Sequence, residues 1–158
     1  MAIYMQYAKI TGDVSTKGYE DWIMLSSFQF GTGRSILSTT GSGANRQGSH
    51  ASVSEITITK SLDPSSLGLW ADSLAGKLDS KVVFSFTLAD QDNKSFLDIT
   101  LTDVGVSGYS TSSGGDRPSE SLSLNFATIQ YQPKFYKPDG SAGDSPIKKY
   151  DLTKHVLS

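Results

Sequence analysis

The feature that most constrains this chain is one amphipathic helix pattern among segments that otherwise read as strand or loop. Residues 53–76 read VSEITITKSLDPSSLGLWADSLAG, a strand, a sharp turn and the only clear helical pattern in the sequence. Ile56 and Ile58 alternate with polar residues at the two-residue period of a half-buried strand. A single amphipathic helix must pack against the sheets that the remaining residues form. The sequence therefore predicts a mainly β fold, a two-sheet, barrel-like sandwich with one flanking helix at about residues 63–76.

The predicted helix has recognisable signals at both ends. Asp63 is a natural N-cap, because its carboxylate can accept hydrogen bonds from the free amides of the first turn, and Pro64 suits the first helical position. Leu62 and Leu67 have the spacing of a hydrophobic staple, and Gly76 can end the helix in the left-handed conformation. The apolar stripe that is predicted to face the core consists of Leu67, Trp70, Ala71 and Leu74.

The rest of the chain supplies the strands of the predicted sandwich. Two-residue alternation predicts strands at 2–10, 20–30, 81–89, 94–102 and 120–131. In the second of these, Trp22, Met24, Phe28 and Phe30 are in phase, whereas Ile23 and Leu25 fall on the opposite face. We predict a single domain over residues 1–158, with a core at 2–131 and a tail at 132–158. The tail is too short to fold alone, so it pairs with the sheet through a last strand or lies over it.

Composition excludes several classes of partner and chemistry. The chain has 158 residues, no cysteine and a formal net charge of −2, so it offers no disulfide and no thiolate ligand. Near-neutral charge gives no reason to expect nucleic acid or an anionic membrane as a partner. The N-terminal segment lacks a signal peptide, and no apolar run approaches the roughly 20 residues that span a bilayer. We expect a protein made in the cytoplasm that leaves the cell, if at all, without the general export pathway.

Catalytic and metal-binding patterns are also missing from the sequence. His50 and His155 have no partner at metal-ligand spacing. The acidic pairs Glu20–Asp21 and Asp90/Asp92 begin a strand and occupy a hairpin turn, where a solvated surface is the simpler interpretation. No nucleophile elbow, phosphate loop or dinucleotide fingerprint is present. The sequence predicts neither an enzyme nor a bound cofactor.

Two glycine-rich loops, at 31–52 and 111–118, interrupt the strand pattern. The first is long for a loop inside a compact domain, and such loops are usually functional or disordered. Arg34, Arg46 and Arg117 are the only arginines, and all three lie in these loops. Arginine favours defined ion pairs at protein interfaces, so the loops are candidates for docking onto another protein. With only three residues, chance placement is the alternative.

Two motifs carry a family resemblance. The chain reads SEITITKSLDPSS at 54–66 and GGDRPSESLSLNF at 114–126, in an order that resembles the Hcp (haemolysin-coregulated protein) family over about residues 2–131. The resemblance implies a fold related to phage tail-tube proteins, a homohexameric ring with a central channel, and rings stacked into the tube of a type VI secretion system. It further implies a contractile sheath around the tube, a VgrG-type spike at its tip, and small effectors carried in the channel. Such a protein leaves the cell through that apparatus without a signal peptide.

The resemblance also suggests roles for particular residues. The loop at 31–52 corresponds to an extension that reaches the neighbouring ring, and its candidate stacking residues are Arg34, Ser38, Gly41, Gly43, Arg46 and Gly48. Candidates for the interface between subunits are Ile23, Leu25, Leu69, Asp116, Arg117 and Glu120. A wet, weakly charged channel wall is expected from Ser121, Ser123, Asn125 and Ala127.

The residues alone also allow a second interpretation of the function. In it, the chain is a β-sandwich binding module that holds a carbohydrate or protein ligand with the loops at 31–52 and 111–118. Sedimentation separates the two interpretations, because such a module has no reason to form a closed ring.

Overall fold

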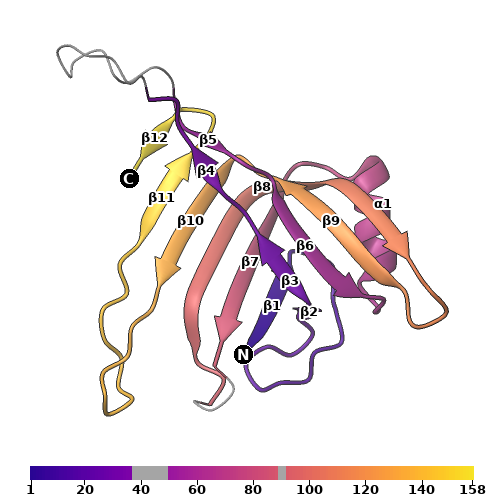
Figure 1. Cartoon of the computed structure of the whole chain (residues 1–158), viewed down its shortest axis with the longest axis horizontal. Coiled ribbons are helices and arrows are strands. Elements are labelled where there is room, and N and C mark those ends of the chain that lie inside the picture. Colours follow the sequence, from indigo (N-terminus) through magenta and orange to yellow (C-terminus); the bar gives the residue numbers. More distant parts are fainter. Residues whose placement is uncertain (37–49, 89–91) are drawn as a thin grey trace.

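The computed structural model describes residues 1–36, 50–88 and 92–158. The predicted stacking residues Ser38, Gly41, Gly43, Arg46 and Gly48 lie outside the described residues. Within them, the chain forms strands and one helix (Figure 1). The strands are β1 (Ala2–Tyr7), β2 (Ile23–Leu25), β3 (Ser27–Gln29), β4 (Thr32–Gly33), β5 (Ser52–Val53), β6 (Ile56–Ser61), β7 (Ser80–Thr87), β8 (Ser95–Ser112), β9 (Ser119–Asn125), β10 (Thr128–Pro133), β11 (Lys148–Asp151) and β12 (Val156–Leu157), and the helix is α1 (Ser66–Ala75).

The strands form a larger and a smaller antiparallel sheet that share β8. The larger sheet has the order β12-β11-β10-β8-β7-β1-β2, and the smaller one has the order β3-β6-β9-β8. The first part of β8, up to Val104, pairs with β7 and β10, whereas its second part, from Gly105, pairs with β9. The two sheets therefore face each other as a sandwich that does not close into a barrel (Figure 1). The mainly β, two-sheet fold with one flanking helix is confirmed.

One predicted strand is in fact two. The segment predicted as a single strand at 120–131 divides into β9 in the smaller sheet and β10 in the larger sheet. The chain crosses between the sheets at Ala127, whose amide donates to the Thr102 carbonyl at 3.0 Å. The buried positions change phase at this crossing, from Leu124 and Phe126 to Ile129. This change of phase in the buried residues is the sequence feature that marks where the chain passes from one sheet to the other.

The core lies between the two sheets, and strand register decides which residues enter it. On β2, Ile23 pairs with Met5 and Leu25 pairs with Ile3, so both β2 residues share the inward face of β1. Ile23 and Leu25 are buried, whereas Met24 is exposed. The predicted phase is therefore wrong for β2, whose two subunit-interface candidates are core residues, whereas Phe28 and Phe30 further along do pack against the core.

The helix begins later than predicted and presents a different face to the core. It starts at Ser66 after an N-cap residue, Ser65, whose side chain makes no capping bond. Asp63 instead accepts a hydrogen bond from the Ser65 amide at 2.9 Å, which fixes the turn before the helix. Gly76 is extended, with φ −68° and ψ 150°, so the predicted left-handed end is wrong.

The predicted buried stripe of the helix faces solvent. Leu67 is 73%, Trp70 48% and Leu74 69% exposed, whereas Leu69, predicted at a subunit interface, is fully buried. The reason is a polar anchor on the inward face. The carboxylate of Asp72 accepts hydrogen bonds from the Tyr7 hydroxyl at 2.8 Å and the Val106 amide at 3.1 Å. These bonds set the rotation of the helix against the sheets, and the larger apolar stripe is left outside.

This orientation changes the expected effect of removing Trp70. Trp70→Ala should lower the free energy of unfolding by about 1 kcal/mol or less, because partly exposed side chains leave no sealed cavity. A fully buried large aromatic residue would cost about 3–5 kcal/mol. Thermal unfolding of both variants as dissociated subunits, with Leu69→Ala as the fully buried comparison, measures the difference. A larger loss for Trp70→Ala than for Leu69→Ala would contradict the observed rotation of the helix.

The tail joins the larger sheet. β11 pairs with β10 through Ile129 and Tyr150, and β12 pairs with β11. The predicted last strand is therefore present as this terminal pair. Across the described ranges, no helix is long and apolar enough to cross a membrane.

Candidate functional site

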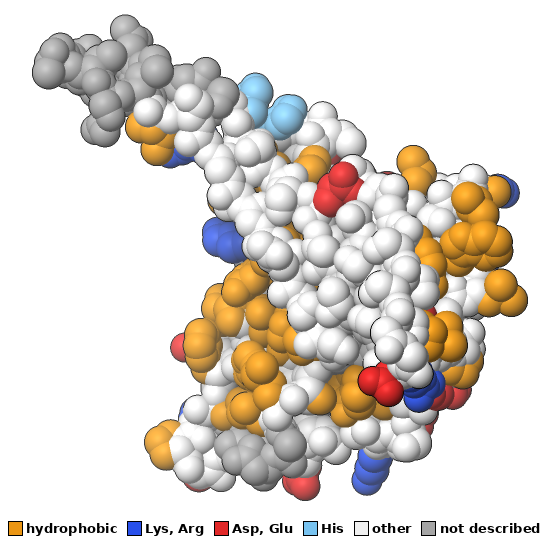
Figure 2. Space-filling view, turned by 45° about the vertical axis from the view of Figure 1, so that its right-hand side comes forward, with side chains coloured by type: hydrophobic (Ala, Val, Ile, Leu, Met, Phe, Trp, Pro, Cys, Tyr) orange, Lys and Arg blue, Asp and Glu red, His pale blue; other side chains and the backbone are white. Residues whose placement is uncertain are grey.

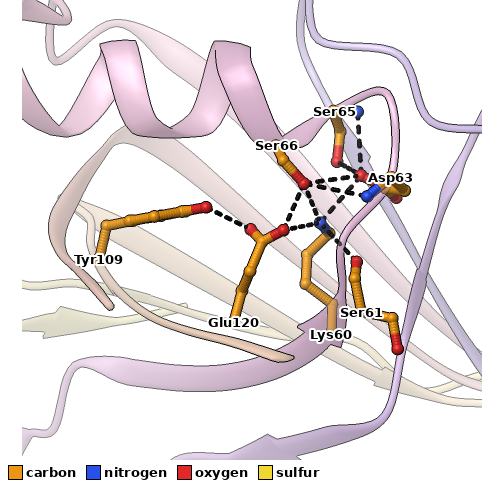
Figure 3. A network of polar contacts seen from close by, with 7 residues as sticks. All are labelled: Lys60, Ser61, Asp63, Ser65, Ser66, Tyr109 and Glu120. Atoms are coloured by element: carbon orange, nitrogen blue, oxygen red, sulfur yellow. Dashed lines mark hydrogen bonds and ion pairs between the residues drawn. The ribbon is translucent and has the colours of Figure 1, made fainter. Parts of the chain in front are cut away.

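A buried ionic cluster ties the helix turn to the smaller sheet (Figure 3). Lys60 lies on the inward face of β6, in phase with Ile56 and Ile58, and is only 1% exposed. Its ammonium group lies 2.8 Å from a carboxylate oxygen of Asp63 and 3.3 Å from one of Glu120. It also donates to the Ser66 hydroxyl at 3.1 Å and the Ser61 carbonyl at 3.0 Å. Burial of a lysine is tolerated here because its charge is paired and hydrogen-bonded.

Glu120 is the acidic centre of this cluster. One of its carboxylate oxygens accepts from the Ser66 hydroxyl and from Lys60, and the other accepts from the Tyr109 hydroxyl at 2.8 Å. Burial raises the pKa of Tyr109, and the neighbouring Glu120 carboxylate raises it further, so this hydroxyl stays protonated as a donor at neutral pH. Glu120 is 1% exposed. The prediction that it lies at a subunit interface is therefore wrong for this residue, whereas Asp116 and Arg117 are exposed.

A second buried tyrosine anchors the other end of the helix. Tyr7 donates to Asp72, and its pKa is raised by burial first and by that carboxylate second. The two clusters fix α1 at both ends. They are interactions that hold the helix against the two sheets.

The outer face of the smaller sheet is a continuous polar surface almost free of charge. Its cross-strand rows are short hydroxyl and amide side chains, Ser27–Thr59–Ser121–Ser110 in one row and Gln29–Thr57–Ser123 in the next. Ser121 and Ser123 thus lie at the centre of this face, which we call the hydroxyl face, and Asn125 lies at its end. Beside this face, the carboxylate of Glu55 accepts from the Ser107 hydroxyl. The region shows as a broad pale area in Figure 2.

Two apolar surfaces remain uncovered. One, the helix ridge, consists of Leu67, Trp70 and Leu74 on α1. The other, the apolar hollow, lies where the larger sheet extends past the smaller one, and both surfaces show as clustered hydrophobic side chains in Figure 2. The hollow is formed by Phe30, Val53, Ile129, Tyr131, Tyr150 and Leu157.

A cavity of about 490 Å³ forms the deep part of the hollow. Thr32, Arg34, His50 and Val53 border it from the β4–β5 side, and Ile129, Tyr150, His155 and Leu157 border it from β10–β12. The rings of His50 and His155 stack at 4.4 Å between centroids. No local pattern in the sequence indicates this contact, because it depends on how the tail folds back onto the larger sheet. Among the described residues, no group of three potential ligands could hold a metal ion.

The chain matches known proteins over most of its length. Residues 4–132 match the family described as "Type VI secretion system effector, Hcp". Protein hcp1 of Pseudomonas aeruginosa is 37% identical over 101 residues, which cover 61% of this chain and 61% of that protein.

Solved structures share the fold. "Structure of a type six secretion system protein" superposes with a TM-score of 0.90 at 22% identity, over 99% of both chains. Hcp1 from Salmonella typhimurium superposes with a TM-score of 0.76 at 18% identity, over 100% of both chains. The family match spans both motifs, the strand that leads into the helix turn and the strand that carries Glu120. The chain belongs to the Hcp family of type VI secretion proteins.

Proposed function

We propose that this protein is the structural subunit of a type VI secretion tube, in which hexameric rings stack into a conduit that a contractile sheath expels. The observation that carries the proposal is the hydroxyl face, considered together with membership of the family. In the described part of the chain, the outer face of the smaller sheet consists of nearly uncharged, short polar side chains.

Such a face suits the wall of a channel that carries cargo. Hydroxyl groups keep the wall wetted, and the absence of ion pairs and large apolar groups avoids tight binding to a passing protein. Ser121, Ser123 and Asn125 are the wall residues in this arrangement. Small effectors would occupy the channel, and a VgrG-type spike would close its tip. The role is mechanical, with no catalysis and no cofactor, and the protein would be made in the cytoplasm and exported by the apparatus itself.

The alternative of a ligand-binding module using both glycine-rich loops gains partial support from the structure. The cavity is bordered by Arg34 and His50, which lie in the first loop. However, β4 and β5, which carry that loop, and the turn between β8 and β9 lie at opposite ends of the molecule (Figure 1). One small ligand would not contact both, so the tube remains the better proposal.

Cysteine labelling tests the orientation of the hydroxyl face, because the natural chain has no cysteine. Ser123→Cys should leave a ring that sediments as a closed hexamer, and its thiol should react with a bulky polymer maleimide at least about tenfold more slowly in the ring than in the dissociated protein. Lys81→Cys, at an exposed residue of β7 outside this face, is the matched control and should react at one rate in both states.

Two different results would contradict different parts of the proposal. Equal rates for Ser123→Cys in ring and dissociated protein would place the hydroxyl face outside the channel. A wild-type protein that stays monomeric at high concentration would contradict the tube itself.

A further inference from the structure

We propose that neighbouring subunits of the ring join by seating the helix ridge of one copy in the apolar hollow of the next. The inference rests on the proposed function, and it names the two surfaces that close the ring. Neither surface was indicated by the sequence, in which the ridge was predicted to be buried and the hollow was not recognised.

The ridge is held outside by the structure beneath it. Leu69 is buried under the helix, and Asp72 is fixed by Tyr7 and Val106, so α1 cannot turn to bury Trp70 without breaking these contacts. A shallow cavity of about 370 Å³ lies beside Trp70, bordered by Leu62, Leu67, Tyr109 and Thr111. The ridge is thus a fixed, exposed apolar surface with an indentation beside Trp70, its largest side chain. Surfaces of this kind are typical of protein–protein interfaces.

The hollow is the uncovered end of the larger sheet's inner face. One cross-strand row of that face runs from Val82 through Leu101 and Ile129 to Tyr150 and Leu157. Along it the exposed fraction rises from 0% at Val82 and Leu101 through 7% at Ile129 to 63% at Leu157. The smaller sheet covers the first part of the row, and no described segment covers the last part. The inner face of the larger sheet is therefore buried in the core at the Val82 end of this row and exposed to solvent at the Leu157 end.

A second copy of this chain fits the hollow for reasons of position, shape and charge. The helix and the β10–β12 end lie on opposite sides of the molecule, so one copy cannot fill its own hollow (Figure 1). The ridge side chains are exposed on the helix, whereas the hollow residues border a cavity of about 490 Å³. The cavity border carries Arg34, His50 and His155 and no carboxylate. The helix Ser66–Ala75 contains no lysine or arginine, so docking brings no like charges together.

The geometry also fits ring closure. Two different surfaces on one subunit make a head-to-tail contact, and such a contact generates a ring when the rotation that relates neighbouring subunits closes. Trp70 is the expected anchor, since buried tryptophans at the centre of an interface carry much of its binding energy.

Complementary blocked variants test this pairing. Leu67→Glu with Trp70→Glu blocks the ridge and leaves the hollow intact, and Tyr131→Glu with Leu157→Glu does the reverse, so the two blocked surfaces repel each other. All four side chains are at least 41% exposed, so both proteins should fold. We expect each variant alone to be monomeric in sedimentation velocity. Mixed in equal amounts they should form a dimer and nothing larger, because one intact ridge and one intact hollow remain.

A milder variant and a control complete the experiment. Trp70→Lys alone should weaken association at least about thirtyfold, the effect of losing an interface residue worth 2 kcal/mol or more. Met24→Glu, at an exposed apolar residue of β2 outside both surfaces, should form the wild-type ring. Near-UV circular dichroism verifies that each protein is folded.

The failures of the two proposals are distinguishable. If wild type forms the ring and folded Trp70→Lys forms it equally well, or if the mixed variants do not dimerise, the ridge and hollow are not the joined surfaces and the tube proposal stands. If wild type forms no ring at all, both proposals are overturned.

Discussion

Replacing Lys60 by methionine is expected to lower the free energy of unfolding by about 3–5 kcal/mol, the range for breaking a buried ion pair. Methionine fills a similar volume, so the loss comes from the carboxylate of Glu120, which stays buried without its cation. Asp63 also loses its ion pair, although it keeps the Ser65 amide as a donor. Urea unfolding followed by tryptophan fluorescence measures the change. A loss below about 1 kcal/mol would mean that water reaches Glu120.

The matched double variant separates a lost charge pair from lost packing. Lys60→Met with Glu120→Leu removes both charges, and it should recover at least about half of the stability lost by Lys60→Met alone. Lys134→Met is the surface control. Its ammonium lies 2.6 Å from Asp98, but both side chains are partly exposed, so the expected loss is about 1 kcal/mol or less. No recovery in the double variant would show that packing around Lys60, and not charge pairing, dominates.

Replacing residues 38–48 by a short Gly-Ser turn is expected to spare the hexamer and abolish tube extension and secretion. These residues lie outside the described part of the structure, and the proposal for them comes from the family resemblance. The replacement leaves the ridge, the hollow and both sheets unchanged, so ring closure should persist. Electron microscopy shows whether rings stack. Immunoblotting of culture supernatant, from cells with an intact sheath and from cells without one, shows whether the protein is exported.

A surface hairpin provides the control for this change. Asp139 accepts from the amide of Ser141 at the tip of a turn in the tail, and a Gly-Ser replacement of 139–141 should leave stacking and export unchanged. Loss of the hexamer in the 38–48 variant would place that loop at the ring-closing interface instead. Normal export would show that the loop has no part in stacking, and export without a sheath would remove the contractile mechanism.

The sequence predicted the fold class because strand alternation is a local property. Ile56, Ile58, Leu122 and Leu124 are inward as their two-residue period indicates, and the helix occurs where the turn signals at Asp63 place it, within three residues. The same local pattern recognised Ser121 and Ser123 as an outward, uncharged pair. Family membership also follows from the sequence, since the two motifs that carry it are contiguous.

Only the tertiary structure determines which apolar residues are buried in the core and which are exposed on the surface. On the helix, period 3.6 marks the larger stripe as the core face, but hydrogen bonds from Tyr7 and Val106 to Asp72 turn that stripe outward. On β2, pairing with Met5 buries Ile23, although Trp22 and Met24 are the larger residues. Lys60 and Glu120 are charged residues on inward positions, and they are distant in sequence, so no local pattern indicates that they neutralise each other. A sequence records what each residue prefers on average, whereas register, helix rotation and charge pairing depend on contacts between strands that only the folded chain brings together.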